Sequence, residues 1–143
     1  MKALPVLVAI FILGNLIPSN AGTVSTNNAD GTKTVSIVDG QKRPLEISEY
    51  NADGSLVKKT AFERDQEGKP LKMTVRSADG HVKRVEIYSY DQNGNVVATK
   101  TTNQDGAVWT RQDAYDEHGN HLKSRVIDPK GNEGAPDVWL RAD

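Results

Sequence analysis

Short runs of alternating apolar and polar residues fill most of this chain, and turn-forming residues separate them at regular intervals. The runs cover about 32–38, 42–50, 55–64, 69–77, 82–90, 95–103, 107–115, 120–127 and 136–141. Alternation with a period of two is typical of strands, and no run after residue 21 shows apolar positions at helical spacing. The pattern therefore predicts an all-β protein, an antiparallel meander of about eight to nine strands joined by tight hairpin turns.

Glycines mark the predicted reversals, at positions 31, 40, 54, 68, 80, 94, 106, 119 and 131. Asp or Asn precedes most of them, and Asp-Gly and Asn-Gly favour two-residue turns in which both residues have positive φ. We therefore expect two-residue turns at most of these positions. A three-residue loop with a glycine bulge is expected at Asp79-Gly80, where it would bring Val75 and Val85 to one face, and likewise at Asp39-Gly40.

This pairing predicts one apolar and one polar face. The apolar face is expected to carry Val85, Ile87, Val96, Ala98, Trp109, Tyr115, Leu122 and Val126, and the polar face Tyr88, Thr99, Thr101, Thr110, Gln112, Lys123 and Arg125. An apolar stripe is costly to leave in water, since a large aliphatic side chain gains about 1.5–3 kcal/mol on burial. With no helix to cover it, we expect the sheet to curve into a β-spiral or an up-and-down barrel-like sheet, with a sandwich or association with another chain as alternatives.

The N-terminus has the pattern of an export signal. Lys2 precedes an apolar run that ends at Pro18, and Ser19 and Ala21 place small residues before a cut after Ala21. The predicted organisation is a signal peptide at 1–21, a flexible segment at 22–31 and a single β-repeat domain at 32–143. The expected location is secreted or periplasmic, with no stable membrane insertion after cleavage.

Composition argues against several classes of function. The chain has no cysteine, and its 18 basic and 19 acidic side chains are interspersed, so there is no basic stripe for nucleic acid. The histidines, His81, His118 and His121, lie at or beside predicted turns and suggest no metal site, and we expect no cofactor. Asp113 and Asp116 fit solvated strand ends, so we expect no enzyme; a glycan hydrolase would need two carboxylates in a cleft.

The turns repeat with a period of two strands. Gly54, Gly80, Gly106 and Gly131 are 26, 26 and 25 residues apart. The segments Tyr90-Asp-Gln-Asn-Gly-Asn95, Asn103-Gln-Asp-Gly106, Tyr115-Asp-Glu-His-Gly-Asn120 and Asp128-Pro-Lys-Gly-Asn132 recur in alternation. They resemble the tyrosine-aspartate (YD) repeats of bacterial Rhs and wall-associated proteins over residues 90–132, and loosely over 50–80, where Arg64 replaces a tyrosine. The resemblance implies a β-spiral, an extracellular structural or encapsulating role, in some members carbohydrate binding, and no catalysis within the repeats.

Exposed tyrosines are the candidate ligand-binding residues. Tyr50, Tyr88 and Tyr90 are expected to project from the polar face, where a ring can stack on a sugar or insert into a partner surface. The predicted function is a secreted or periplasmic, non-catalytic β-repeat module with a structural or binding role and a carbohydrate, cell-envelope or protein partner. Two alternatives stay open: a small-ligand barrel with a pocket lined by Phe62, Met73 and Ile87, and a secreted effector or inhibitor that presents a turn to a protein.

Overall fold

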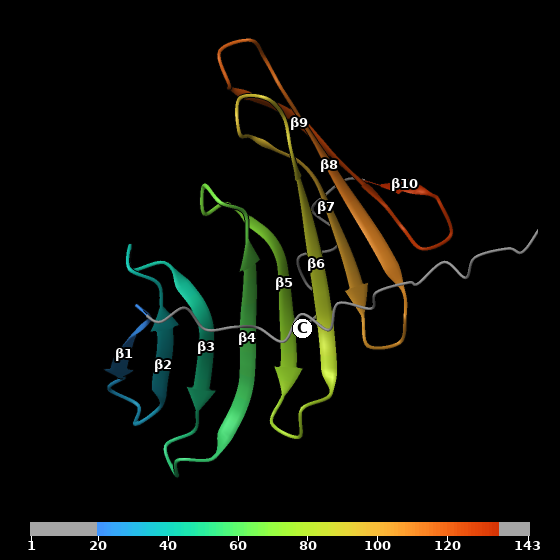
Figure 1. Cartoon of the computed structure of the whole chain (residues 1–143). Helices are drawn as coiled ribbons and strands as arrows, with labels where there is room; N and C mark the ends of the chain where they lie inside the picture. The colour runs from blue at the N-terminus through green and yellow to red at the C-terminus, as the bar shows by residue number, and fades with distance from the viewer. Residues whose placement is uncertain (1–19, 135–143) are drawn as a thin grey trace, which may run out of the picture.

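The protein folds as one antiparallel sheet of ten strands that follow one another in chain order (Figure 1). A computed structural model describes residues 20–134. The strands are β1 (Gly22–Asn27), β2 (Lys33–Val38), β3 (Pro44–Tyr50), β4 (Leu56–Arg64), β5 (Pro70–Ser77), β6 (Val82–Tyr90), β7 (Val96–Asn103), β8 (Val108–Tyr115), β9 (His121–Ile127) and β10 (Glu133–Gly134). The all-β antiparallel meander is therefore confirmed. Over residues 20–134 the sheet is not closed into a barrel, because β1 and β10 do not pair with each other.

Two of the predicted segments fall wholly or largely beyond these residues. Nearly all of the predicted signal peptide and the last predicted strand, at 136–141, lie outside the described residues. At the N-terminal edge the structure differs from the expectation of a flexible 22–31 segment. Strand β1 pairs with all six residues of β2, from Gly22 opposite Val38 to Asn27 opposite Lys33. Every residue of β1 is exposed, so β1 lacked the buried apolar alternation on which strand prediction depends.

All nine hairpins share one turn geometry. In the turn at 91–95 the amide of Asp91 donates to the Asn95 carbonyl at 3.0 Å, and the amide of Gly94 donates to the Asp91 carbonyl at 3.1 Å. Gly94 has φ of 85°, whereas the residue before it does not have positive φ. This is a three-residue loop closed by a glycine bulge. The expectation of two-residue turns with a positive-φ pair is therefore wrong. In this hairpin a register shift between Ser89 and Tyr90 still leaves Ser89 opposite Ala98, as expected.

The turn at 39–43 departs from the glycine pattern. The amide of Lys42, not of Gly40, donates to the Asp39 carbonyl, at 3.0 Å. Lys42 has φ of 65°, and no other described non-glycine residue has positive φ. Gly40 is only the second residue of a turn that otherwise matches the turn at 91–95. A lysine therefore occupies the left-handed position that glycine fills elsewhere, at a cost in backbone strain.

The strand pairing gives the sheet a different division of faces from the expected one. Thr74 pairs with Val85 and Val75 with Arg84, so Val75 and Val85 lie on opposite faces. Ile47 pairs with Ser36, which likewise puts Val35 and Ile37 on the face opposite Ile47. Paired residues share a face and neighbours in a strand alternate. We call the two surfaces the Tyr88 face and the Ile87 face.

Apolar residues occupy both faces. The Tyr88 face carries Val24, Ser36, Ile47, Thr60, Phe62, Met73, Val75, Glu86, Tyr88, Thr99, Thr101, Trp109, Arg111, Asp113, Ser124 and Val126. The Ile87 face carries Val35, Ile37, Ser48, Ala61, Thr74, Val85, Ile87, Ala98, Lys100, Thr110, Gln112, Lys123 and Arg125. The expected grouping of Ile87 with Trp109 and Val126 on one apolar face is therefore wrong.

Burial in this sheet is thin. Among described apolar residues only Val38 and Val126 are buried, and Leu122 is 64% exposed. Hydrophobic burial therefore contributes less here than in a two-layer domain, and the hydrogen bonds of the ladder and turns carry more of the stability.

Side chains tie the turns at one end of the sheet to one another. The Tyr90 hydroxyl donates to the Pro70 carbonyl at 2.6 Å, and the Tyr115 hydroxyl donates to the Val96 carbonyl at 3.2 Å. Arg64, at the equivalent position one repeat earlier, donates from Nε to the Pro44 carbonyl at 3.2 Å. The tyrosine that precedes the turn aspartate is thus a brace between repeats, and arginine replaces it without losing the hydrogen bond.

Candidate binding surface on the Tyr88 face

The structure separates the three candidate tyrosines. Tyr88 and Tyr90, both in β6, alternate with Ser89 and lie on the Tyr88 face. Tyr50 pairs with Lys33 and lies on the opposite face, so the expectation that all three share one surface is wrong. All three are only half-buried.

Tyr90 has a structural contact at each end of its side chain. Its hydroxyl is bound to the Pro70 carbonyl, and the Lys69 ammonium lies 5.9 Å from its ring centroid. Burial raises the pKa of Tyr90. Because its hydroxyl bonds the backbone at the preceding turn of the same repeat series and Lys69 lies over its ring, we assign Tyr90 to the braces and not to ligand binding.

Tyr88 lies in a row that crosses three strands. It pairs with Thr99 of β7, which pairs with Arg111 of β8. Its hydroxyl donates to Glu86 Oε2 at 2.6 Å, and burial, followed by this hydrogen bond, strongly raises the pKa of Tyr88. Neighbouring strands are about 4.8 Å apart, so the row spans about 10 Å. The row presents the Tyr88 ring, the Thr99 hydroxyl and the Arg111 guanidinium in one line.

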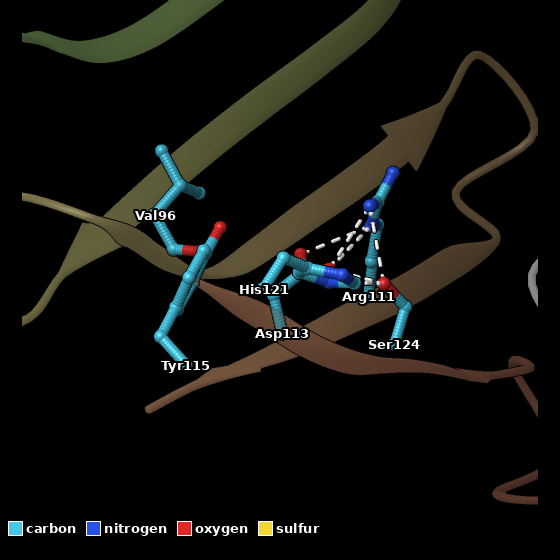
Figure 2. Close-up of polar contacts among 6 residues, drawn as sticks. All are labelled: Val96, Arg111, Asp113, Tyr115, His121 and Ser124. Atoms are coloured by element: carbon cyan, nitrogen blue, oxygen red, sulfur yellow. Dashed lines mark hydrogen bonds and ion pairs between the residues drawn. The ribbon is translucent and has the colours of Figure 1, made fainter. Parts of the chain in front are cut away.

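A polar cluster fixes the far end of this row (Figure 2). The Arg111 guanidinium donates to Asp113 through Nε, at 3.1 Å to Oδ1 and 3.0 Å to Oδ2, and through Nη2, at 2.9 Å to Oδ1. Arg111 Nη2 also lies 3.2 Å from Ser124 Oγ. The Arg111 Nη1 makes no hydrogen bond within the described part of the chain, and Figure 2 shows it directed away from Asp113. Asp113 therefore orients Arg111 and leaves part of its guanidinium available.

Asp113 is the most enclosed charge of the cluster. Its side chain is 5% exposed and accepts hydrogen bonds from Ser124 Oγ and from His121 Nε2, the latter at 2.9 Å. Burial alone would raise the pKa of Asp113, but hydrogen bonds from Arg111, Ser124 and His121 outweigh it and lower the pKa. The carboxyl is thus held as a carboxylate at neutral pH.

The cluster contains serine, histidine and aspartate, but not in the arrangement of a catalytic triad. A triad needs the aspartate on one ring nitrogen and the serine on the other. Here His121 Nε2 lies 2.9 Å from both Asp113 Oδ1 and Ser124 Oγ. The Ser124 hydroxyl also donates directly to Asp113, so its proton is already engaged. Tyr115 packs edge-on against His121, with ring centroids 5.3 Å apart, and completes a structural contact.

The other expected sites are not assembled. Phe62 and Met73 pair with each other on the Tyr88 face, whereas Ile87 lies on the opposite face and is 46% exposed, so they do not line one pocket. A groove of about 380 Å³ lies instead over β7–β9, lined by Val97, Gln112, Asp113, Ala114, Lys123 and Arg125. Within residues 20–134 no three His, Cys, Asp or Glu side chains are grouped to hold a metal ion.

Sequence reasoning missed Arg111 as a member of the Tyr88 row and Ser124 as a partner of Arg111 and Asp113. Asn93-Gly94 aligns Tyr88 with Thr99, but a two-residue turn at Asp105-Gly106 would place Gln112 opposite Thr99. Strands β7 and β8 pair without a register shift, so Arg111 takes that place, where Asp113 holds it in a salt bridge.

Comparison with known proteins leaves the family open. No family model and no curated protein matches the chain. Among solved structures, it is similar to a chain of the Tc holotoxin pore of Photorhabdus luminescens, at 14% sequence identity and a TM-score of 0.30. That match covers 78% of this chain and 9% of the toxin chain. Separately, residues 20–134 contain no helix of the length and hydropathy needed to cross a membrane.

Proposed function

We propose that this protein is an exported, non-catalytic β-repeat module that binds carbohydrate through the Tyr88 face. The observation that carries the proposal is the row of Tyr88, Thr99 and Arg111, in which Asp113 holds the guanidinium in place. An aromatic ring offers a flat apolar surface to a sugar, and a fixed guanidinium offers directed donors to its hydroxyl groups.

The surroundings of the row support a binding role. Within residues 20–134 no second layer packs on the Tyr88 face, because the strands form a single sheet and contact mainly their neighbours in it. Leu71, in strand β5 beside β6, is 43% exposed. An uncovered face with half-exposed aromatic and aliphatic side chains is typical of an interaction surface.

The proposal also holds that the protein is exported and that it is not an enzyme. The hydrogen bonds of Asp113, His121 and Ser124 fit a role in orienting Arg111, and they engage the Ser124 hydroxyl that nucleophilic attack would need. The N-terminal pattern of Lys2, an apolar run and Ala21 supports a secreted or periplasmic location. Polysaccharides of the cell envelope are the carbohydrates available there.

Binding is tested on a glycan array with the purified protein expressed from the full chain. Wild type is expected to bind a defined set of glycans, and Tyr88→Ala to lose up to about tenfold in affinity, since stacking contributes up to about 1.5 kcal/mol. Tyr50→Ala is the matched control, because Tyr50 is equally half-buried but on the other face. No glycan binding by the folded wild type, or equal loss in both variants, would overturn the proposal.

A further inference from the structure

Strand β1 forms one edge of the sheet, and its sequence has none of the usual edge protection. Figure 1 shows β1 at the end of the sheet, with β2 as its one neighbour among the described strands. The sequence of β1 is Gly-Thr-Val-Ser-Thr-Asn, without charge or proline. Its pairing with β2 runs over six residues without a bulge. Natural sheets normally blunt an edge with charges, proline or a bulge, so an edge of this kind is a template for another strand.

The groups available on this edge follow from the hairpin. The Asn28 amide donates to the Thr32 carbonyl at 2.9 Å, which makes that pair hydrogen-bonded. Because hydrogen-bonded and non-hydrogen-bonded pairs alternate, Asn27, Ser25 and Thr23 direct their backbone N–H and C=O groups away from β2. Three donors and three acceptors therefore lie in one line along the outer side of β1.

The opposite edge is different. Strand β9 carries Lys123 and Arg125 along its length, and β10 covers its end by pairing with Val126 and Ile127. A further nine residues, 135–143, follow β10 in the chain. The charged side chains protect β9, so the two edges are unequal as docking sites.

We propose that β1 pairs antiparallel with β1 of a second copy of this chain, with the two-fold axis at Ser25. Ser25 then faces Ser25 of the second copy, and Thr23 faces its Asn27, which joins the outward groups in about six hydrogen bonds. Val24, 45% exposed, packs beside Thr26 of the second copy on the Tyr88 face. The uncharged strand meets itself without repulsion, and a strand of the partner fits without any change in β2. The two Tyr88 faces become one continuous surface.

Sedimentation equilibrium on the protein purified from the full chain tests the stoichiometry. Wild type is expected to be a dimer, and Ser25→Pro to weaken dimerisation about 30-fold, because it removes both central N–H donors. The N–H of Ser25 points away from β2, so the β1–β2 ladder should stay intact, and Ser25→Thr, which keeps the N–H, should dimerise like wild type. A wild type that is monomeric at all concentrations, or a dimer unaffected by Ser25→Pro, would overturn the proposal.

A cysteine test does not depend on the proline variant folding. The chain has no cysteine, so Ser25→Cys introduces a single thiol at the two-fold axis. Mild oxidation should link most of the protein into a disulfide dimer, whereas Ser89→Cys, exposed in the interior strand β6, should stay monomeric. Equal cross-linking of the two variants contradicts the β1 interface.

Discussion

Glycine-to-alanine substitution at three turns tests the observed turn geometry. Gly80 has φ of 87° and open space where an added methyl group would lie, so alanine there costs only the backbone strain. That strain is about 1 kcal/mol, equivalent to a fall of about 4 °C in Tm for a domain of this size. Gly40 does not have positive φ, and its nearest neighbour is the end of the exposed Asn20 side chain, which can move aside. Alanine at Gly40 should therefore change stability by less than about 0.5 kcal/mol.

A third glycine adds a side-chain contact to the backbone cost. Gly68 has φ of 88°, and a methyl group there would overlap the Arg43 guanidinium, which donates from Nη1 to the Glu67 carbonyl at 3.0 Å. Loss of that hydrogen bond adds about 1 kcal/mol, for a total of about 2 kcal/mol. Urea unfolding of the three variants should show a cost that rises in the order Gly40→Ala, Gly80→Ala, Gly68→Ala. A cost at Gly40 equal to that at Gly80 would refute the geometry.

Three further predictions follow from individual contacts. Lys42→Gly should stabilise the protein by about 0.5 kcal/mol in urea unfolding, because it relieves the strain at φ of 65° but adds chain entropy to the unfolded state; destabilisation would contradict this assignment. Tyr90→Phe should lower the free energy of unfolding by about 1 kcal/mol, because it removes the hydrogen bond to the Pro70 carbonyl. Tyr50→Phe is the control and should leave the free energy of unfolding unchanged. Equal effects of the two variants would contradict the role of Tyr90 as a brace. Hydrogen bonds from Asn95 and Asn120 lower the pKa of Asp91 and Asp116. The stability that these hydrogen bonds add is therefore present above the unfolded pKa of about 3.9 and is lost as pH falls below it. A Tm that is constant from pH 5 to pH 2 would exclude this linkage.

The alternation of residues was enough to predict the strands and the meander, because period-two patterning and Asp-Gly or Asn-Gly pairs report on local geometry. Strand β1 was missed since all its residues are exposed and give no amphipathic signal. The division of faces failed for a different reason. The expected turn lengths gathered Val75 and Val85 on one face, on the assumption of a single buried surface, whereas the sheet has apolar residues on both.

The candidate site could be predicted only in part. Tyr88 was identifiable as an aromatic residue in a strand, and Thr99 as its partner, but the expected two-residue turn at Asp105-Gly106 led to Gln112 instead of Arg111. The cluster around Asp113 was not identifiable, because the hydrogen bonds of Asp113 with Arg111, His121 and Ser124 depend on side-chain orientation across β8 and β9. Lys42 could not be predicted at the left-handed turn position, since lysine has no preference for positive φ.

The register between β5 and β6 tests the two-faced sheet most directly. It can be measured by disulfide formation between introduced cysteines, because the chain has no cysteine of its own. The double variant Thr74→Cys with Val85→Cys should oxidise to an intramolecular disulfide, read by mass spectrometry and thiol titration, because these residues are paired. Val75→Cys with Val85→Cys should keep both thiols, because their side chains lie on opposite faces. A disulfide in the second variant and free thiols in the first would contradict the register and, with it, the separation of the Tyr88 face from the Ile87 face.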